Sequence, residues 1–375
     1  MTTIYVKEQG AVVGRNGERL VIRKGGAVLE EVPMANVSEL ALMGNVQLTA
    51  QAVATLLARE VDVVFLSTYG KYRGRLSGSG SKHARLRHRQ LLALGDEAGT
   101  LAVARAIVDG KINNQRVLLQ RQRRRGEGAA DPLPNPPPRG EGADPLPGPP
   151  PRGEGAGRGA RGPFDVARFD RALAGMMRMR QAAVGAGNLE ALRGYEGKAA
   201  AFYFDAVRSL LEPAWGFARR EYYPPPDPFN ALLSFGYSLL QKVVFAAVNR
   251  VGFDPYLGCF HELEYGRPSL ALDLMEEWRP VVVDALALEL VNRGRLRPEQ
   301  FERTGSVKRP VQLGEAGVEL VLRAYGERLE GVVYHPDAGS GGGQTTVRHA
   351  IRLQAYRLAR VVLEGGAAYV PFVVR

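Results

Sequence analysis

Residues 11–33 read AVVGRNGERLVIRKGGAVLEEVP, which are three short β-prone runs separated by two turn sequences. Asn16-Gly17 and Gly25-Gly26 can adopt the positive φ angles that tight hairpin turns require, and the runs around them alternate apolar with polar residues. The run before them, from residue 3, is β-prone as well. The whole segment 3–33 is therefore predicted to be a β-meander.

The residues after the meander predict two more strands with one helix between them. Residues 37–44 and 61–67, VSELALMG and VDVVFLS, are typical of strands, and the second is apolar enough to be buried. Thr49 is placed to cap a helix over residues 50–60. The core stripe of that helix consists of Val53, Leu56 and Leu57. Together these elements predict a small β-rich N-terminal domain over residues 1–85.

The second part of the chain is predicted to be mainly helical. Residues 70–90 mix aromatic residues, glycines and cations in a stretch expected to be flexible, which could contact phosphates or could simply be a solvated linker. Residues 86–124 would hold a linker and the first helices, and residues 163–375 an α-helical catalytic domain, because apolar residues recur there with a period of 3.6. The fold class expected is α+β.

An unusual segment separates the first of these helices from the rest. The sequence Arg-Gly-Glu-Gly-Ala begins at Arg125, Arg139 and Arg152, and DPLPNPPP and DPLPGPPP stand between the copies. Such a Pro- and Gly-rich repeat has no apolar face to bury, so its contacts cannot offset the entropy of ordering. Residues 125–162 are expected to be a disordered insertion, with a role as a Pro-rich ligand as the alternative.

The composition of the chain favours a polyanionic partner. Its 375 residues exceed the usual length of one domain, which predicts at least two cores. The formal charge of +11 favours nucleic acid or an acidic membrane surface, and no apolar run was expected to reach the length of a spanning helix. Cys259 is the single cysteine, and the start MTTIYVKEQG lacks the pattern of a signal peptide. A cytoplasmic location is expected.

Residues 261–280, HELEYGRPSLALDLMEEWRP, carry the most chemistry-bearing side chains. On a helix from Ser269, Asp273 precedes Glu276 by three residues and Glu277 by four, so at least two carboxylates share a face. Like charges on an apolar helix repel each other unless a divalent cation lies between them. A surface acidic patch is the alternative, which the apolar flanking runs make less favoured.

Two further residues are candidates for the same site. His261 lies in a Gly- and Pro-rich loop directly before the acidic helix, although a single histidine is more often structural. Glu196, in GYEGKAAAFYF, is expected at the start of an apolar helix, where it could instead stabilise the helix dipole. Each of these signals is weak by itself.

Four segments together resemble the CRISPR-associated integrase and endonuclease (Cas-one) family. They are residues 44–76 (GNVQLTAQAVATLLAREVDVVFLSTYGKYRGRL), 194–204 (GYEGKAAAFYF), 230–240 (NALLSFGYSLL) and 252–280 (GFDPYLGCFHELEYGRPSLALDLMEEWRP). They occur in the order that the family has, and the resemblance extends over nearly the whole chain. The repeat segment 125–162 departs from it.

The resemblance implies a fold, a reaction and partners. It implies an N-terminal β domain, a C-terminal helical domain, a homodimer, DNA as substrate and a small adaptation partner (Cas-two), with which spacer DNA is inserted into a CRISPR array. It also implies catalytic metal ligands at Glu196, His261 and Glu276, with Asp273 as a neighbouring acid. Mg²⁺ or Mn²⁺ suits this donor set, and His261 could be a ligand or a proton carrier.

Two other classes of protein share the basic and helical character of this chain. A tyrosine recombinase would form a covalent tyrosyl intermediate without a metal, and the chain has 14 Tyr. A DNA-binding scaffold would have no catalytic residues at all. Neither class accounts for the carboxylates and the histidine that gather in an apolar stretch.

Overall fold

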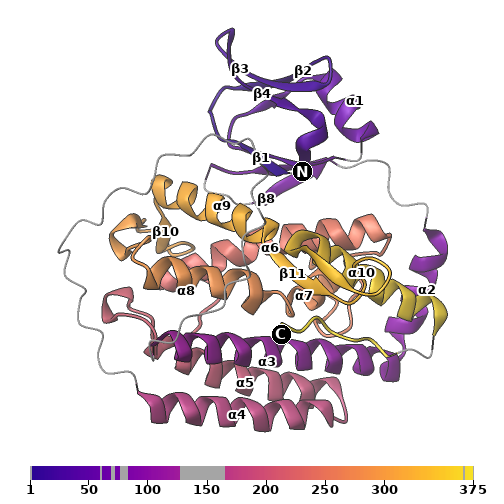
Figure 1. The fold of residues 1–375 in the computed structure, drawn as a ribbon, viewed down its shortest axis with the longest axis vertical. Coiled ribbons are helices and arrows are strands. Elements are labelled where there is room, and N and C mark those ends of the chain that lie inside the picture. The colour runs from indigo at the N-terminus through magenta and orange to yellow at the C-terminus, as the bar shows by residue number, and fades with distance from the viewer. Residues whose placement is uncertain are drawn as a thin grey trace.

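The computed structural model describes residues 2–59, 61–68, 72–76, 83–126, 165–365 and 368–374. Strands form the N-terminal part of the chain, and helices form most of the remainder, as Figure 1 shows. The α+β class with strands first is therefore confirmed. The expected insertion at residues 125–162 lies outside the described residues from position 127 onward.

The N-terminal part contains two four-stranded sheets among its described residues. Their orders are β4-β3-β2-β6 and β1-β5-β7-β8. The strands are β1 (Thr2–Val6), β2 (Val12–Asn16), β3 (Arg19–Lys24), β4 (Ala27–Pro33), β5 (Val37–Met43), β6 (Gln47–Leu48), β7 (Asp62–Leu66) and β8 (Tyr72–Leu76). A short 3₁₀ turn, η1 (Met34–Asn36), connects β4 to β5.

The meander is confirmed for β2, β3 and β4, which pair antiparallel through the two predicted turns. It is wrong for β1, which instead pairs parallel with β5 in the other sheet. The helix α1 (Ala50–Ala58) begins as predicted, since the Thr49 hydroxyl accepts the Ala52 N–H at 3.2 Å. Parallel pairing needs a crossover connection, so local sequence patterns do not reveal it.

The sheet β1-β5-β7-β8 contributes to two cores at once. Leu40 and Leu42 on one face of β5 belong to the core of the N-terminal part, whereas Ala41 and Met43 on the opposite face join the large helical core. Alternate residues of a strand point to opposite faces, which explains the division. The boundary between the two cores therefore follows this sheet.

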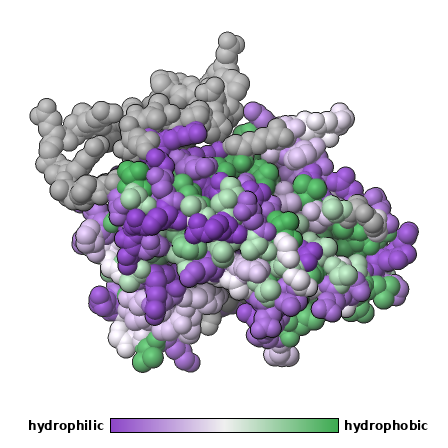
Figure 2. Space-filling model, turned by 90° about the horizontal axis from the view of Figure 1, so that it is seen from below, coloured by the Kyte–Doolittle hydropathy of each residue, from purple (hydrophilic) through white to green (hydrophobic). Residues whose placement is uncertain are grey.

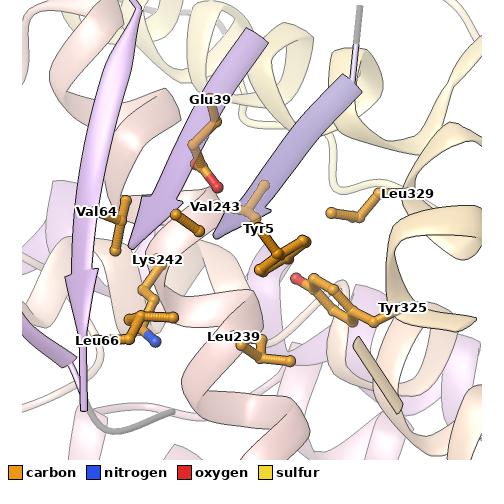
Figure 3. A pocket seen from close by; sticks show the side chains of 10 residues that line it. Tyr5, Glu39, Val64, Leu66, Leu239, Lys242, Val243, Tyr325 and Leu329 are labelled. Atoms are coloured by element: carbon orange, nitrogen blue, oxygen red, sulfur yellow. The ribbon is translucent and has the colours of Figure 1, made fainter. Parts of the chain in front are cut away.

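A small pocket lies where this sheet meets the helices (Figure 3). Tyr5 and Glu39 come from β1 and β5, and Lys242 and Tyr325 come from helices. Burial raises the pKa of Glu39, with Asp62 adding to the shift and Arg348 opposing it. Burial lowers the pKa of Lys242 to about 8, against the opposing effect of Glu39. The contact between the two parts thus includes buried charge as well as apolar surface.

The basic stretch at residues 70–90 is more regular than its composition suggests. Its described residues form β8, which pairs with β7, and the first turns of α2 (Ala84–Gly95). The expectation of a flexible stretch is thus wrong for these two elements. The positions between them lie outside the described part of the chain.

The helical part begins with three long helices that pack together at the bottom of Figure 1. They are α3 (Glu97–Gly126), α4 (Val166–Val184) and α5 (Leu189–Ser209). Hydrophilic side chains cover much of the face on which α4 lies (Figure 2). The 3₁₀ turn η2 (Pro213–Trp215) follows α5.

The helix α6 (Pro228–Val251) corrects an expectation about apolar runs. By length and composition it could cross a membrane, contrary to the expectation that no run reaches that length. Such a property is weak evidence, because the core helix of a globular fold has it too. Here α6 packs against α7, α10 and η3, and more than half of its residues are buried. Packing on several sides accounts for its composition.

The last elements surround α6 and carry the acidic residues. They are α7 (Ser269–Met275), the π-helical turn η3 (Arg279–Asp284), α8 (Ala285–Asn292), η4 (Pro298–Gln300), β9 (Phe301–Arg303), β10 (Val311–Leu313), α9 (Glu315–Glu330), β11 (Val332–His335), β12 (Gly343–Thr346) and α10 (Val347–Glu364). Strands β9 and β10 form one hairpin, and β11 and β12 another. The C-terminal residues then run back over α3 (Figure 1).

Candidate active site

Glu196 lies about two turns inside α5, because that helix begins at Leu189. The expected position at the start of a helix is therefore wrong, and the first-turn acid is Glu190. A macrodipole role fades beyond the first turn, so it does not account for Glu196. The side chain is 17% exposed and points to a buried cation, Lys111.

His261 lies in the loop between α6 and α7, and buried polar contacts hold that loop in place. The buried amide of Gln90 on α2 donates to the carbonyls of Asp254 and Leu257, at 2.8 Å each, and accepts the Asp254 N–H at 2.9 Å. The Ser269 hydroxyl donates to the Glu262 carbonyl at 2.8 Å. The histidine is thus carried by a loop that is anchored on both sides.

Asp273 is the strongest of these anchors. Its carboxylate is fully buried and accepts the backbone N–H groups of Cys259, Phe260 and His261 at 2.6, 3.0 and 2.9 Å. The same carboxylate lies 2.6 Å from His261 Nδ1. When Asp273 accepts the Nδ1 proton, Nε2 keeps its lone pair, and this nitrogen lies 3.7 Å from Glu276 Oε1.

Glu276 follows the last residue of α7 and is 2% exposed. Its Oε1 lies 3.2 Å from Arg279 Nη2, and its Oε2 lies 2.5 Å from Lys111 Nζ. Burial by itself would raise the pKa of Glu276, but Arg279, Lys111 and His261 lower it to about 2. The carboxylate is therefore ionised in spite of its burial.

Lys111 on α3 joins the two glutamates. Its Nζ lies 2.5 Å from Glu196 Oε1 and 2.5 Å from Glu276 Oε2. Burial lowers the pKa of this lysine, but Glu196 and Glu276 raise it by more, so the net shift is upward. Glu196 and Glu276, from separate segments, thus meet at one buried ammonium group, and His261 approaches the other oxygen of Glu276 at 3.7 Å.

These residues suit a divalent metal by their chemistry. Two carboxylates and an imidazole match the preferences of Mn²⁺ and Mg²⁺, and a carboxylate behind the imidazole is the usual support for a histidine ligand. Glu276 Oε2 is buried and accepts no hydrogen bond of good geometry. Among the residues that the structure describes, however, no three acidic, His or Cys side chains lie at metal-binding spacing. Lys111 lies in the space between two of the candidates.

Glu277 does not belong to this group, although the sequence placed it on the same acidic helix. Its carboxylate accepts from Gln354 Nε2, the Tyr369 hydroxyl and the Phe372 N–H, at 3.1, 2.7 and 2.7 Å. These partners belong to α10 and to the C-terminal residues. Glu277 therefore holds the C-terminal segment against the core.

Sequence reasoning missed Lys111 and Arg279. Lys111 interrupts the apolar stripe of α3 that includes Ala104, Ile107 and Val108, all of which are fully buried. A lysine at such a position must pair with an acid when it is buried. The interruption of the apolar periodicity in α3 was therefore the signal that could have identified Lys111. Arg279 stands three residues after Glu276, which is the spacing of neighbours on a helix.

Comparison with known proteins shows to which family the chain belongs. The family model described as CRISPR associated protein Cas1 matches residues 4–134 and 156–327. The endonuclease Cas1 3 of Thermus thermophilus is 33% identical over 374 residues, which cover 99% of this chain and 97% of that protein. The chain belongs to the Cas1 family. The family resemblance drawn from the sequence is thereby confirmed.

Other Cas1 proteins extend this picture. An endonuclease Cas1 1 of Moorella thermoacetica is 31% identical over 100% of this chain and 99% of its own length. A Cas4/Cas1 fusion of Rhodospirillum rubrum is 32% identical over 96% of this chain, which spans 55% of that protein. Relatives with the family name are thus described as CRISPR-associated endonucleases, alone or fused to a Cas4 exonuclease.

Solved structures show the same fold. A Cas1 protein from Thermotoga maritima superposes with a TM-score of 0.72 at 22% identity, over 98% of both chains. A casposase bound to integration product superposes with a TM-score of 0.73 at 19% identity, over 97% of this chain and 91% of that one. The strand-rich N-terminal part followed by helices is therefore the architecture of this family.

Proposed function

We propose that this chain is a divalent-metal-dependent DNA endonuclease and integrase that inserts spacer DNA into a CRISPR array. The observation that carries the proposal is that Glu196 and Glu276 share one buried cation, Lys111, while His261 Nε2 lies 3.7 Å from Glu276. The names of the relatives support nuclease chemistry, and the casposase with its integration product supports strand transfer as the reaction class.

Glu196, His261 and Glu276 would hold Mg²⁺ or Mn²⁺. A cation bound there would neutralise charge that develops on the scissile phosphate and would lower the pKa of the attacking hydroxyl. The ionised state of Glu276, with its pKa near 2, makes this carboxylate available as a donor over the whole physiological pH range. No nucleotide is consumed, which agrees with the absence of a GxxxxGK[ST] motif from the sequence.

The protein side chains have distinct roles in this scheme. Asp273 fixes the ring of His261, so that Nε2 faces Glu276 and the reacting groups. His261 then acts either as a ligand or as a proton carrier for the attacking or the leaving oxygen. Arg279 Nη2 lies 3.2 Å from the oxygen of Glu276 that His261 also approaches, Oε1. Because these groups are largely buried, bulk water has little access to them.

The reaction exchanges one phosphodiester for another. The 3′-hydroxyl of the incoming DNA attacks the phosphorus of the acceptor strand, a new P–O bond forms, and the bond to the acceptor 3′ oxygen breaks. The proton of the attacking hydroxyl passes to a base, and the leaving oxygen takes up a proton. Attack by water in place of the hydroxyl gives a nick, which is the expected side activity.

The proposed partners are DNA and a second small protein. The formal charge of +11 favours contacts with phosphates. A complex described as Cas6-RT-Cas1–Cas2 contains a chain that superposes on this one with a TM-score of 0.72. We propose by analogy that a homodimer of this chain binds double-stranded DNA with 3′ ends together with a Cas2-type partner in the cytoplasm.

Two tyrosines that contact Asp284, Tyr203 and Tyr237, do not suit the nucleophile of a tyrosine recombinase. Tyr203 and Tyr237 are buried, and their hydroxyls donate to Asp284 at 2.9 and 2.6 Å. Burial and the charge of Asp284 raise the pKa of both hydroxyls well above the usual value. A phenol that is held in this way is a poor nucleophile.

The test is an integration assay with the purified full chain, its small partner and DNA with free 3′ ends. Strand transfer should require Mg²⁺ or Mn²⁺ and stop with EDTA. Glu196→Ala, His261→Ala and Glu276→Ala should each abolish it while DNA binding persists. Glu190→Ala, which alters an exposed acid on the same helix as Glu196, is the matched control and should retain activity. Full activity in EDTA would contradict the proposal, and so would full activity in the three variants.

A further inference from the structure

Lys111 occupies an unusual position for a lysine in an enzyme that is proposed to use a metal. Its side chain is 9% exposed, and its Nζ contacts both Glu196 Oε1 and Glu276 Oε2 at 2.5 Å. These are two of the three residues to which the divalent cation is assigned. The singly charged ammonium group of Lys111 thus lies between the two carboxylates.

The contacts of Lys111 with Glu196 and Glu276 stabilise the site when no metal is bound. Two ionised carboxylates that face each other in a buried space would repel, and a charged group in such a space needs partners. Lys111 satisfies both glutamates at once, and Arg279 adds a second positive charge at Glu276. The side chains can therefore keep their positions when no divalent ion is bound.

We propose that Lys111 is an internal competitor of the divalent cation. Its ammonium group neutralises Glu196 and Glu276 in the metal-free chain, and it moves away from at least one of them when the cation binds. Lys111 therefore lowers the affinity for the metal and sets the concentration at which the site fills. This inference rests on the proposed metal-dependent function.

The physical reason is a competition for the same oxygen atoms. Glu276 Oε2 and Glu196 Oε1 face the ammonium group, so their lone pairs reach a divalent ion fully only when that group withdraws. In addition, a positive charge a few ångströms away repels the incoming ion. A like charge at such a distance changes a binding equilibrium by about tenfold or more, as it does for a proton.

The experiment measures Mn²⁺ binding to the full chain by titration calorimetry, without DNA. Lys111→Met and Lys111→Gln remove the charge and should bind Mn²⁺ about tenfold more tightly than the wild type, or tighter still. Lys111→Arg keeps the charge and should bind no more tightly. Lys242→Met is the matched control, because it removes a lysine that lies beside an acid, Glu39, in a different contact. Its affinity for Mn²⁺ should equal that of the wild type.

Thermal melting provides the second readout. Without Mn²⁺, Lys111→Met should melt at a lower temperature than the wild type, because two carboxylates lose their cation. Saturating Mn²⁺ should raise the melting temperature of Lys111→Met by more than it raises that of the wild type. If Lys111→Met does not fold without metal but folds with it, the inference is supported. Equal or weaker Mn²⁺ binding by the Met and Gln variants overturns the inference while the proposed function stands. No Mn²⁺ binding by any form, with strand transfer that is insensitive to EDTA, overturns both.

Discussion

The groups that surround Glu276 differ in charge from those that donate hydrogen bonds to Glu277, although both carboxylates are buried. Glu276 is surrounded by Lys111, Arg279 and His261, which are cations or can become cations. Burial raises its pKa, but these charges outweigh burial and bring the pKa to about 2. The carboxylate of Glu276 is therefore ionised at neutral pH and is neutralised by these neighbours.

The groups that donate hydrogen bonds to Glu277 are neutral, and the nearby charge of Arg357 lowers its pKa less than they do. The side chains of Gln354 and Tyr369 and the backbone of Phe372 donate to it. Burial raises the pKa of Glu277 to about 7, because these hydrogen bonds oppose the effect of burial only in part. Asp284 resembles it in its hydrogen bonds, which come from two tyrosine hydroxyls, although the charges of Arg279 and Arg220 also act on it. We therefore expect an acid in this buried region to take part in the proposed chemistry where cations contact it, and to support packing where neutral groups donate to it.

The sharpest test of this difference exchanges the two glutamates for glutamine one at a time. Glu276→Gln should reduce strand transfer by at least about a hundredfold, which is the usual effect of losing charge stabilisation in a transition state. Glu277→Gln should leave the rate close to that of the wild type. Both should lower the free energy of unfolding, Glu277→Gln by about 1–3 kcal/mol, because each leaves buried groups poorly paired.

Rates from the integration assay and unfolding in denaturant provide the two measurements. The comparison between the pockets fails if Glu277→Gln, folded and dimeric, loses activity as completely as Glu276→Gln does. It also fails if Glu276→Gln remains active at saturating Mn²⁺.

The next largest effect is expected at Asp273, which holds the ring of His261 and is not one of the proposed metal ligands. Asp273→Asn would turn an amide toward the N–H groups of Cys259, Phe260 or His261 and would release the ring of His261. Loss of such a support for a ligand typically costs about 10- to 100-fold in activity or metal affinity.

The control for this substitution lies in the same loop. The Asp254 side chain accepts the Tyr256 N–H at 2.9 Å and makes no contact with His261 that the structure records. Asp254→Asn should therefore retain strand transfer. Equal Mn²⁺ affinity and equal rates in Asp273→Asn and the wild type would show that the orientation of His261 does not depend on Asp273.

Local patterns were sufficient to predict most of the fold. The Asn16-Gly17 and Gly25-Gly26 turns, the cap at Thr49 and the long helices depend on neighbours in the sequence, and they were predicted correctly. The parallel pairing of β1 with β5 joins residues about 35 positions apart, and no periodicity in either strand specifies its partner. The contribution of one sheet to two cores was missed for the same reason.

The site was predictable only in part. The family resemblance led to Glu196, His261 and Glu276. The structure links the two glutamates through Lys111 and places His261 near Glu276, and their role as ligands stays a prediction. Lys111 was missed because its partners lie on other helices. The sequence could not separate Glu276 from Glu277 either, since α7 ends at Met275 and the chain then passes into η3, which changes the side that each residue faces.

A smaller effect is expected at Asp284, as a dependence of stability on pH. Burial raises the pKa of Asp284 to about 6, although Tyr237, Tyr203 and two arginines oppose the shift. In the unfolded chain its pKa would be about 3.9. The folded state therefore holds the proton more tightly, so this contribution to stability is complete below about pH 4 and is lost as the pH rises to about 6.

Asp284→Asn removes the titrating group and keeps one acceptor for the tyrosines. The free energy of unfolding of the wild type minus that of Asp284→Asn should fall by roughly 1–3 kcal/mol between pH 4 and pH 7. Denaturant unfolding in EDTA measures it, and Asp170→Asn, at an exposed acid of α4, is the control. A difference that is constant with pH would show that Asp284 does not belong with the neutral-donor pockets.

The smallest effect is expected from residues 127–161, which lie outside the described part of the chain. Arg123 Nη1 near the end of α3 lies 2.5 Å from Asp170 Oδ1 near the start of α4, so the two helix ends are close together. A short linker can therefore join them, and loop-closure entropy changes only with the logarithm of loop length.

Replacing residues 127–161 by about eight Gly and Ser residues should keep thermal stability, dimerisation and metal-dependent strand transfer. The arginines of the segment could add weak phosphate contacts, which would show as a small loss of DNA affinity at low salt only. Unfolding or loss of the dimer in the shortened chain would show that the repeat is an ordered part of the fold on which the two pockets depend.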